Sequence, residues 1–295
     1  GTYSSAYTPN VFTVNNQKGE VLITLEDNSA LKDSLRLYSS EKKEFGSFNT
    51  STGVSLNYWM IKPSKMEEGK KYPVLFYVYG GPASQEVLNS QRRATDMYWG
   101  MMLAQQGYIT ICVDPRGTGM KGQEFRKCTY LELGKYETED MIEAAKYFGE
   151  LNYIDKNRMG VFGWSYGGYM STLAITKGAD YFKTAIAVAP VTNWRYYDNI
   201  YTERFMRTPQ ENGENYDINS PINHVKKLKG NYLLIHGTAD DNVHIQNSMD
   251  LVDALIKANK HFEMFYYPNK NHSIYGGNTR LHLYTTMTDF LLRKL

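Results

Sequence analysis

One segment, residues 158–176 (RMGVFGWSYGGYMSTLAIT), constrains the fold more than any other part of this chain. The apolar residues 159–162 predict a short strand, and the apolar residues after position 166 predict a helix. The tight turn between them fits the pattern G-x-S-x-G, with Ser165 at its centre. Gly163 and Gly167 remove the Cβ atoms that would clash where the chain reverses. The pattern predicts a serine nucleophile at the start of a helix; the alternative is a loop filled with small residues.

The segments around this turn predict strands that alternate with helices. Continuous apolar runs such as VLFYVY (74–79) and TAIAVA (184–189) are typical of a sheet that is covered on both faces. We expect strands at 54–61, 74–79, 108–113, 159–162, 184–189, 232–236 and 262–267. We expect helices at 98–106, 136–150, 166–176, 244–258 and 279–293, and a polar loop at 208–221. This alternation predicts an α/β protein with a doubly wound, mainly parallel sheet, as in the α/β-hydrolase fold.

The first 43 residues follow a different pattern. Residues 11–14 and 21–25 predict the two strands of a hairpin, joined by a polar turn that contains Gly19. The residues DNS at 27–29 are of the types that cap helices, and they predict a short helix after them. A lone hairpin cannot bury a core. We therefore expect residues 1–43 to be the end of a larger β structure with a linker helix, and residues 44–295 to be one α/β domain.

Composition argues against several classes of protein. The net charge of the 295 residues is +2 and no basic stripe is present, so a nucleic-acid partner is not expected. The two cysteines, Cys112 and Cys128, imply no disulfide framework, and no Cys/His spacing is typical of a metal site, so we expect neither metal nor cofactor. No apolar run is long enough to span a bilayer. Because the chain begins at Gly1, we expect it to be a processed piece of a longer protein.

A serine nucleophile needs a base that takes its proton and an acid that orients the base. In hydrolases of this fold the order along the chain is Ser, then Asp or Glu, then His, each in a loop after a strand. Of the six histidines, only His272 lies in a loop between the last predicted strand and the last predicted helix, so we expect it to be the base. His236 lies in the predicted strand 232–236, and we expect it to be a hydrogen-bonded core or strand-end residue. Asp240 and Asp241 both follow a predicted strand, and spacing alone does not choose between them. Asp114 precedes Ser165, so we expect it to have a structural role.

Two hydrogen-bond donors are needed to stabilise the oxyanion of an acyl-transfer reaction. The backbone N–H of Tyr166, the residue after the serine, is expected to be the first. The second is expected in the loop after the strand at 74–79, where Gly80 and Gly81 allow the backbone to approach a substrate. The candidates there are a backbone N–H and the hydroxyl of Tyr79.

Four motifs carry a resemblance to a known family. They are GWSYGGY (163–169), VYGGPASQ (78–85), HGTADDNVH (236–244) and APVTNWRYYDNIYTER (189–204). From about residue 25 onward, the chain resembles the C-terminal catalytic domain of the dipeptidyl peptidase IV group, within the prolyl oligopeptidase family of serine peptidases. The resemblance implies a catalytic triad of Ser165, Asp240 and His272. It also implies that the hydroxyl of Tyr79 is the second oxyanion donor.

The resemblance implies a substrate site as well. Asn242 would bind a substrate carbonyl, and five side chains would line a slot for proline: Val191, Trp194, Tyr197, Tyr201 and Val243. Proline is compact and apolar and packs well against aromatic rings. From spacing alone, the aromatic residues at 194, 197 and 201 instead predict one helix that buries an aromatic face.

The activity implied by the resemblance is release of X-Pro or X-Ala dipeptides from peptide N-termini through an acyl-enzyme. The alternatives are a related tripeptidyl or acylaminoacyl peptidase, an esterase, or an interaction module without activity. In this family a β-propeller precedes the hydrolase domain and supplies the carboxylates that bind the substrate's N-terminus. We expect residues 1–25 to be the end of its last blade, and no pair such as Glu67-Glu68 to replace those carboxylates. The resemblance further suggests a homodimer and an extracytoplasmic location, in the periplasm or at the cell surface.

Overall fold

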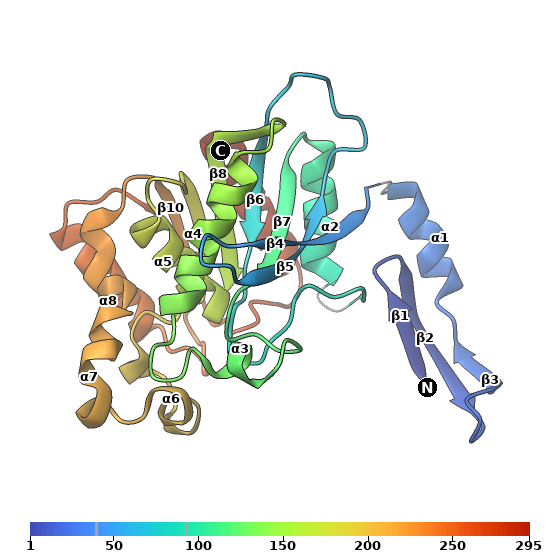
Figure 1. Ribbon diagram of the computed structural model, residues 1–295, viewed down its shortest axis with the longest axis horizontal. Helices are drawn as coiled ribbons and strands as arrows, with labels where there is room; N and C mark the ends of the chain where they lie inside the picture. Colours follow the sequence, from blue (N-terminus) through green and yellow to red (C-terminus); the bar gives the residue numbers. More distant parts are fainter. Residues whose placement is uncertain (39–40, 92–93) are drawn as a thin grey trace.

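The computed structural model describes residues 1–38, 41–91 and 94–295 of the chain, and an eight-stranded sheet forms its centre (Figure 1). The strands are β4 (Lys43–Asn49), β5 (Ser55–Ile61), β6 (Tyr72–Tyr77), β7 (Ile109–Asp114), β8 (Ile154–Trp164), β9 (Thr184–Val188), β10 (Asn231–Gly237) and β11 (Glu263–Tyr267). Their order in the sheet is β11-β10-β9-β8-β6-β7-β5-β4. The six strands β6 to β11 pair in parallel, whereas β5 is antiparallel to both of its neighbours, β7 and β4. The predicted mainly parallel sheet is confirmed, and β4 is an additional edge strand.

Helices cover both faces of this sheet. On one face lie α4 (Lys135–Gly149), α5 (Tyr166–Lys177) and α8 (Gln246–Lys257), and on the other lie α2 (Ala94–Gln105) and α9 (Thr279–Lys294). In β6, Val74 and Phe76 are buried in the core beneath α4 and α5, while Leu75 and Tyr77 are buried in the core beneath α2 and α9. Burial on both sides explains the continuous apolar runs of the strands. The architecture is the predicted α/β-hydrolase fold.

The predicted polar loop at 208–221 is wrong. Between β9 and β10 the chain forms η1 (Trp194–Tyr196), α6 (Asn199–Met206), α7 (Pro209–Ile218) and η2 (Pro221–Lys227). Glu211 accepts the backbone N–H of Thr208 (3.2 Å) and its hydroxyl (3.0 Å) at the start of α7, and Pro209 occupies the first helical position. Tyr216 anchors this helix, because it is buried and its hydroxyl donates to the carbonyl of Arg207 (2.6 Å). The capping residues at 208–211 therefore start a helix here, although the segment is polar throughout.

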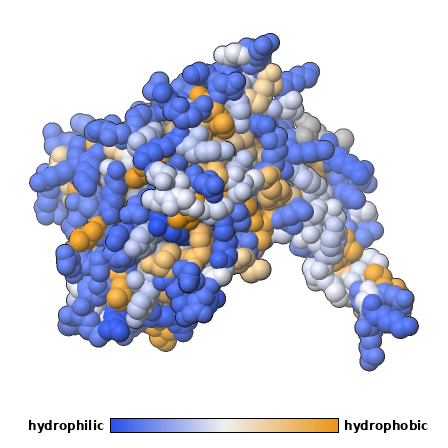
Figure 2. Space-filling model, viewed as in Figure 1, coloured by the Kyte–Doolittle hydropathy of each residue, from blue (hydrophilic) through white to orange (hydrophobic). Residues whose placement is uncertain are grey.

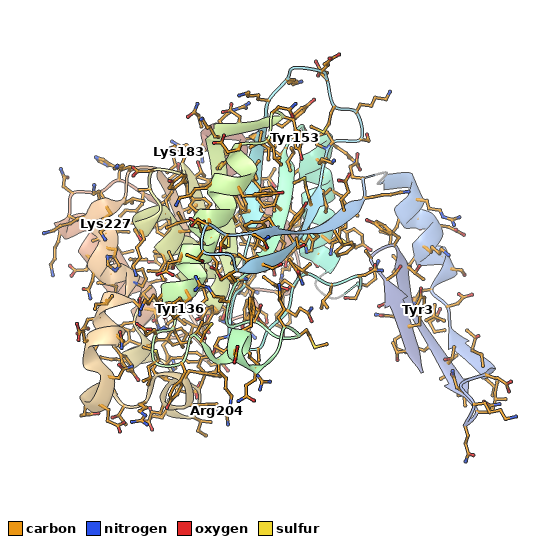
Figure 3. The ribbon with its side chains drawn as sticks, viewed as in Figure 1. Tyr3, Tyr136, Tyr153, Lys183, Arg204 and Lys227 are labelled. Carbon is orange, nitrogen blue, oxygen red and sulfur yellow. The ribbon has the colours of Figure 1, made fainter. Side chains whose placement is uncertain are left out.

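The N-terminal residues form a small sheet of their own, which projects from the main body (Figure 1). The strands β1 (Thr2–Ser5), β2 (Thr8–Asn15) and β3 (Val21–Glu26) pair antiparallel, which confirms the predicted hairpin. The predicted helix follows as α1 (Ser29–Tyr38), where Asp27 accepts the N–H of Ser29 (2.9 Å). Figure 3 places Tyr3 on this sheet, away from the central domain.

Strand β3 is exposed along its whole length, although it contains four large apolar residues: Val21, Leu22, Ile23 and Leu25. Figure 2 shows hydrophobic residues at the surface of this projecting unit. A further short helix, α3 (Gln123–Lys127), follows β7 in the central domain. Within the described ranges, no helix combines the length and the apolarity needed to cross a bilayer.

Candidate active site

The predicted strand, turn and helix around Ser165 are present. Ser165 lies between β8 and α5 with φ 61° and ψ −119°, a backbone conformation that residues with a Cβ rarely adopt. Its N–H donates to the carbonyl of Val188 on β9 (2.8 Å), which holds the turn against the sheet. A Cβ on Gly163 would clash with the carbonyl of Gly167, and a Cβ on Gly167 would clash with the carbonyl of Val78. The two glycines therefore permit a turn that presents Ser165 at the N-terminus of α5.

Asp240 and His272 meet in the loops that follow β10 and β11. Nδ1 of His272 lies 2.7 Å from Oδ2 of Asp240, and Oδ1 of Asp240 accepts the N–H groups of Asn242 (3.0 Å) and Val243 (2.9 Å). Burial alone would raise the pKa of Asp240, but the hydrogen bonds from His236 and His272 outweigh it and hold the pKa well below its usual range. The carboxylate is therefore ionised and oriented toward His272.

Asp241, the other candidate acid, is exposed in the same loop. The geometry separates the two aspartates, because the turn directs the Asp240 carboxylate toward the backbone N–H groups two and three residues later.

His236 also contacts Asp240, a contact that sequence reasoning missed. This histidine is fully buried at the end of β10, and its Nε2 lies 3.1 Å from Oδ2 of Asp240 and 2.8 Å from the carbonyl of Val243. Its Nδ1 lies 2.7 Å from the hydroxyl of Ser248. All these contacts are satisfied when Nε2 carries the proton and Nδ1 accepts the hydroxyl of Ser248. The expectation of a hydrogen-bonded histidine at a strand end is confirmed, and the side chain also fixes the acid.

Ser165 and His272 line one cavity of about 360 Å³. Trp164, the residue before the nucleophile, donates its indole N–H to the carbonyl of His272 (3.0 Å). This hydrogen bond connects the loop that carries His272 to the turn that carries Ser165. The cavity lies where the parallel strands end, which is the edge at which open α/β sheets bind their ligands.

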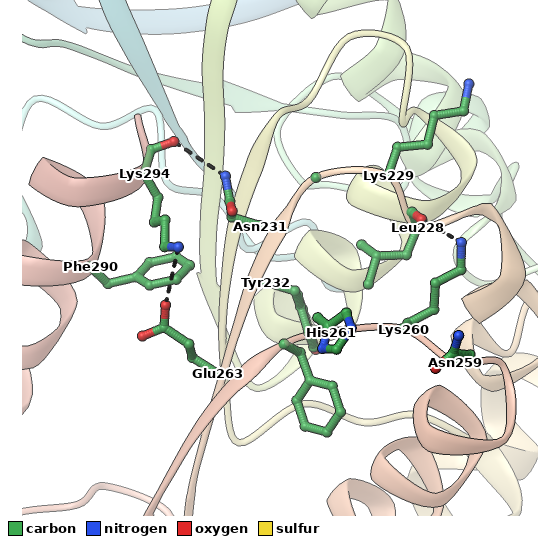
Figure 4. A pocket seen from close by; sticks show the side chains of 12 residues that line it. Leu228, Lys229, Asn231, Tyr232, Asn259, Lys260, His261, Glu263, Phe290 and Lys294 are labelled. Atoms are coloured by element: carbon green, nitrogen blue, oxygen red, sulfur yellow. Dashed lines mark hydrogen bonds and ion pairs between the residues drawn. The ribbon is translucent and has the colours of Figure 1, made fainter.

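A second cavity, of about 430 Å³, lies at the opposite edge, where β10 and β11 begin (Figure 4). Its polar groups contact one another: Nζ of Lys294 lies 3.7 Å from Glu263, and Nζ of Lys260 donates to the carbonyl of Leu228 (2.9 Å). Neither Ser165 nor His272 reaches it.

The loop after β6 carries Tyr79 to the same cavity as Ser165. The carboxylate of Asp114 accepts the backbone N–H groups of Glu86 (3.0 and 3.2 Å) and Val87 (3.0 Å), so Asp114 has the predicted structural role in this loop. The ring of Tyr79 lies 6.1 Å from the ring of Tyr166. The two residues expected to supply oxyanion donors therefore lie side by side.

Behind Tyr166 lies a buried carboxyl group that the sequence did not suggest. Glu137 is fully buried on α4, where it accepts the hydroxyl of Tyr166 (2.6 Å) and the N–H of Gly134 (3.0 Å). Burial raises the pKa of Glu137 to about 7. Glu137 is separated from Tyr166 by 29 residues and belongs to no motif, so no local signal marks it.

We expect Glu137→Gln to alter the pH dependence of stability. Folding raises the pKa of Glu137 from 4.5 to about 7. The contribution of Glu137 to the free energy of unfolding is therefore fully present below about pH 4.5 and is lost as the pH rises through about 7. Glutamine does not ionise. The free energy of unfolding of the variant, relative to the parent, should therefore improve by about 2–3 kcal/mol from pH 5 to pH 8. Urea unfolding at both pH values measures this, with exposed Glu139→Gln as the matched control, and parallel pH profiles for parent and Glu137→Gln would contradict it.

The three aromatic residues of the predicted slot form one cluster. The ring of Trp194 lies 5.8 Å from the rings of Tyr197 and Tyr201, and those two rings lie 5.2 Å apart. The interpretation as one helix is wrong, because η1 ends at Tyr196 and Asp198 caps a new helix by accepting the N–H of Tyr201 (2.9 Å). We call Trp194, Tyr197 and Tyr201 the aromatic cluster.

The other residues of the predicted slot surround the aromatic cluster. Val191 and Val243 are buried in the same core, and the ring of Tyr166 lies 5.4 Å from the ring of Trp194. Asn242 accepts the hydroxyl of Tyr197 (3.0 Å). The structure thus brings the predicted substrate residues next to the nucleophile turn.

In the described part of the chain, no group of three or more His, Cys, Asp or Glu residues could hold a metal ion. Cys112 is buried in β7, and Cys128 is half-buried just after α3.

Comparison with known proteins shows the family of this chain. The model of the prolyl oligopeptidase family matches residues 96–295. The chain belongs to the prolyl oligopeptidase family. Two curated members of comparable similarity are prolyl endopeptidase FAP from Mus musculus, 43% identical over 271 residues, and "Probable dipeptidyl-aminopeptidase B" from Paracoccidioides lutzii, 43% identical over 273 residues. These alignments cover 90% and 91% of this chain.

Comparison of this structure with solved structures supports the same family assignment. The crystal structure of Porphyromonas gingivalis dipeptidyl peptidase 4 matches the whole chain with a TM-score of 0.94 and 48% sequence identity. The chain spans 41% of that protein, and 35% and 29% of the two curated relatives. The resemblance seen in the motifs is thereby confirmed.

Proposed function

We propose that this chain carries the catalytic site of a serine peptidase that releases X-Pro or X-Ala dipeptides from peptide N-termini. The observation that supports it most is the 2.7 Å contact between Asp240 and His272, in a loop that shares a cavity with Ser165. These groups follow the order and roles of a Ser-His-Asp triad. The names of the relatives, a dipeptidyl peptidase and a dipeptidyl-aminopeptidase, favour the same reaction.

In the proposed reaction, Oγ of Ser165 attacks the carbonyl carbon of proline while Nε2 of His272 takes the hydroxyl proton. Asp240 keeps the proton of His272 on Nδ1, so that Nε2 is free to accept. The tetrahedral intermediate collapses when His272 gives its proton to the leaving amine. Water then attacks the acyl-enzyme with the same base, which releases the dipeptide and restores Ser165.

The aromatic cluster is the proposed site for the proline ring. Its rings lie between the nucleophile turn and α6, and aromatic faces bind a compact ring that has no N–H to satisfy. Asn242 lies at its edge, beside Tyr197, where its amide would bind a substrate carbonyl. We expect these rigid aromatic rings to pack better against the compact proline ring than against a leucine or a charged side chain.

We expect Tyr79→Phe to lower the acylation rate by about 10²–10³ while the KM changes little. The reason is that a donor to the oxyanion acts only once negative charge develops. Single-turnover kinetics with a Gly-Pro ester and a Gly-Pro anilide measure the step. Full activity of the variant would move the role to a backbone N–H of the Tyr79–Gly80–Gly81 loop, and Tyr98→Phe on α2 serves as the control.

The proposed function is tested by comparing kcat/KM for Gly-Pro, Gly-Ala and Gly-Leu anilides and for a simple acyl ester. We expect Gly-Pro to exceed Gly-Leu by at least about a hundredfold. A preference for the acyl ester over every dipeptide would favour an esterase, and no turnover of any substrate would favour an interaction module.

We propose that release of products two residues long is a property of the whole protein and not of this chain alone. The relatives are longer than this chain, which supports association of the catalytic domain (44–295) with a β-propeller whose last blade ends in residues 1–25, followed by a linker helix up to residue 43. We also propose a homodimer and an extracytoplasmic location, by analogy with the family. The other curated relative is named an endopeptidase, so cleavage within longer chains is the second candidate activity.

The 295 residues themselves are expected to distinguish poorly between free and blocked N-termini. We expect the carboxylates that bind the substrate ammonium to come from the proposed β-propeller and not from residues 1–295. A charged hydrogen bond to a substrate ammonium is worth about 1.5–3 kcal/mol, and we expect most of it to be missing here. The measurement is kcat/KM for H-Gly-Pro and acetyl-Gly-Pro anilides. A preference of a hundredfold or more for the free amine would contradict this prediction.

A further inference from the structure

The cavity beside Ser165 and the aromatic cluster lie on opposite sides of the nucleophile. Trp164 and Tyr284, two walls of the cavity, pack against the core beneath α2 and α9. The aromatic cluster instead belongs to the core beneath α4 and α5. A peptide whose proline occupies the aromatic cluster would therefore extend its leaving part into the cavity.

One wall of this cavity carries a cation with an ordered position. Arg280 is half-buried, and the carbon of its guanidinium lies 4.8 Å from the centre of the Trp164 ring. The indole is itself fixed, because it donates to the carbonyl of His272 (3.0 Å). A planar guanidinium held against an aromatic ring keeps its N–H groups available for a carboxylate.

The guanidinium of Arg280 also forms a hydrogen bond with the hydroxyl of Tyr284, and the same hydroxyl donates to Asp96 (2.7 Å). No ion pair between described residues includes Arg280, whereas Asp96 across the cavity accepts the hydroxyl of Tyr284 and has a further partner. Arg280 also lies in the first turn of α9, which contains no acidic residue. The positive end of the helix dipole therefore adds to its charge.

We propose that Arg280 selects peptides with a carboxylate in the part after the scissile bond, which this cavity would receive. This inference rests on the proposed function and names a substrate class for it. The carboxylate has two sources: the side chain of an acidic residue that follows proline, or the C-terminal carboxylate of a tripeptide. Both present the same planar acceptor to the guanidinium.

The test uses ratios of kcat/KM within one enzyme preparation, which cancel differences in active fraction. Gly-Pro-Glu-Ala-amide against Gly-Pro-Gln-Ala-amide tests the side chain, and Gly-Pro-Ala against Gly-Pro-Ala-amide tests the C-terminus. We expect at least one ratio to be about five to ten in the parent and to fall to about one in Arg280→Gln. Arg280→Lys should keep part of the preference, because it keeps the charge but not the planar fork.

The matched control is Arg293→Gln, which removes the same charge from the other end of α9, where Arg293 pairs with Glu263 (2.8 Å). Its ratios should equal those of the parent. Cleavage of all four peptides by the parent with both ratios near one would overturn this inference alone. Equal loss of preference in Arg280→Gln and Arg293→Gln would also overturn it. Absence of cleavage of every peptide would overturn the proposed function and this inference together.

Discussion

Ser165→Ala is expected to lower kcat for a Gly-Pro anilide by about 10⁵–10⁶, while binding of the dipeptide product changes little. The hydroxyl is the atom that forms the acyl-enzyme, so its removal leaves only the contributions of binding and the oxyanion donors. Initial rates at saturating substrate give kcat, and calorimetry with Gly-Pro gives the binding.

The same cavity offers a matched control. Ser273 follows His272 and lines the cavity with Ser165, yet it is exposed and takes no part in the proposed reaction. Ser273→Ala should keep kcat within about threefold of the parent. A large loss in Ser273→Ala with a small loss in Ser165→Ala would reverse the assignment of the nucleophile.

Asp240→Asn is expected to lower kcat by about 10³–10⁴. The amide N–H of asparagine can donate to Nδ1 of His272, which would place the imidazole proton on Nε2. A protonated Nε2 cannot accept the proton of Ser165. The substitution also removes a charge that accepts from four groups: the backbone N–H groups of Asn242 and Val243 and the side chains of His236 and His272.

Asp241→Asn tests the choice between the two aspartates, because it makes the same chemical change one residue away on an exposed side chain. We expect kcat to stay within about threefold of the parent. Thermal unfolding of both variants separates loss of fold from loss of chemistry. Similar kcat losses at the two positions, with both variants folded, would mean that the acid is misassigned.

The triad candidates could be predicted because each belongs to a local pattern. The strand, turn and helix around Ser165 are encoded within nineteen residues, and His272 is marked by a loop between a strand and a helix. The choice of Asp240 over Asp241 depends on which carboxylate accepts the N–H groups of the following turn, and two adjacent aspartates leave that open. The family motif, rather than spacing, made the choice.

His236 and Glu137 show what local patterns miss. The strand position of His236 predicted a buried, hydrogen-bonded side chain, but its contact with Asp240 depends on how the loop after β10 folds back. Glu137 reaches Tyr166 only because α4 packs against α5. Contacts between elements that are distant in the sequence carry no periodic signal, and a buried carboxyl group resembles a surface glutamate in the sequence.

In the segment between β9 and β10, the average polarity and the aromatic spacing suggested the wrong structure, although local capping residues predicted the right one. The polar residues 208–221 favoured a loop, although Thr208, Pro209 and Glu211 are a helix start. The aromatic spacing favoured one helix, although Asp198 caps a second one between Tyr197 and Tyr201. Capping residues decide where a helix begins more directly than average polarity does.

Covalent labelling is the sharpest test of whether Ser165 is a nucleophile activated by His272 and Asp240. A fluorophosphonate reacts with an activated serine and stays attached, so mass spectrometry of the digested protein identifies the residue. We expect one label per chain, on the peptide that contains Ser165, and at least about a hundredfold slower labelling in His272→Ala. Labelling of another serine, or an equal rate in His272→Ala, would contradict the account.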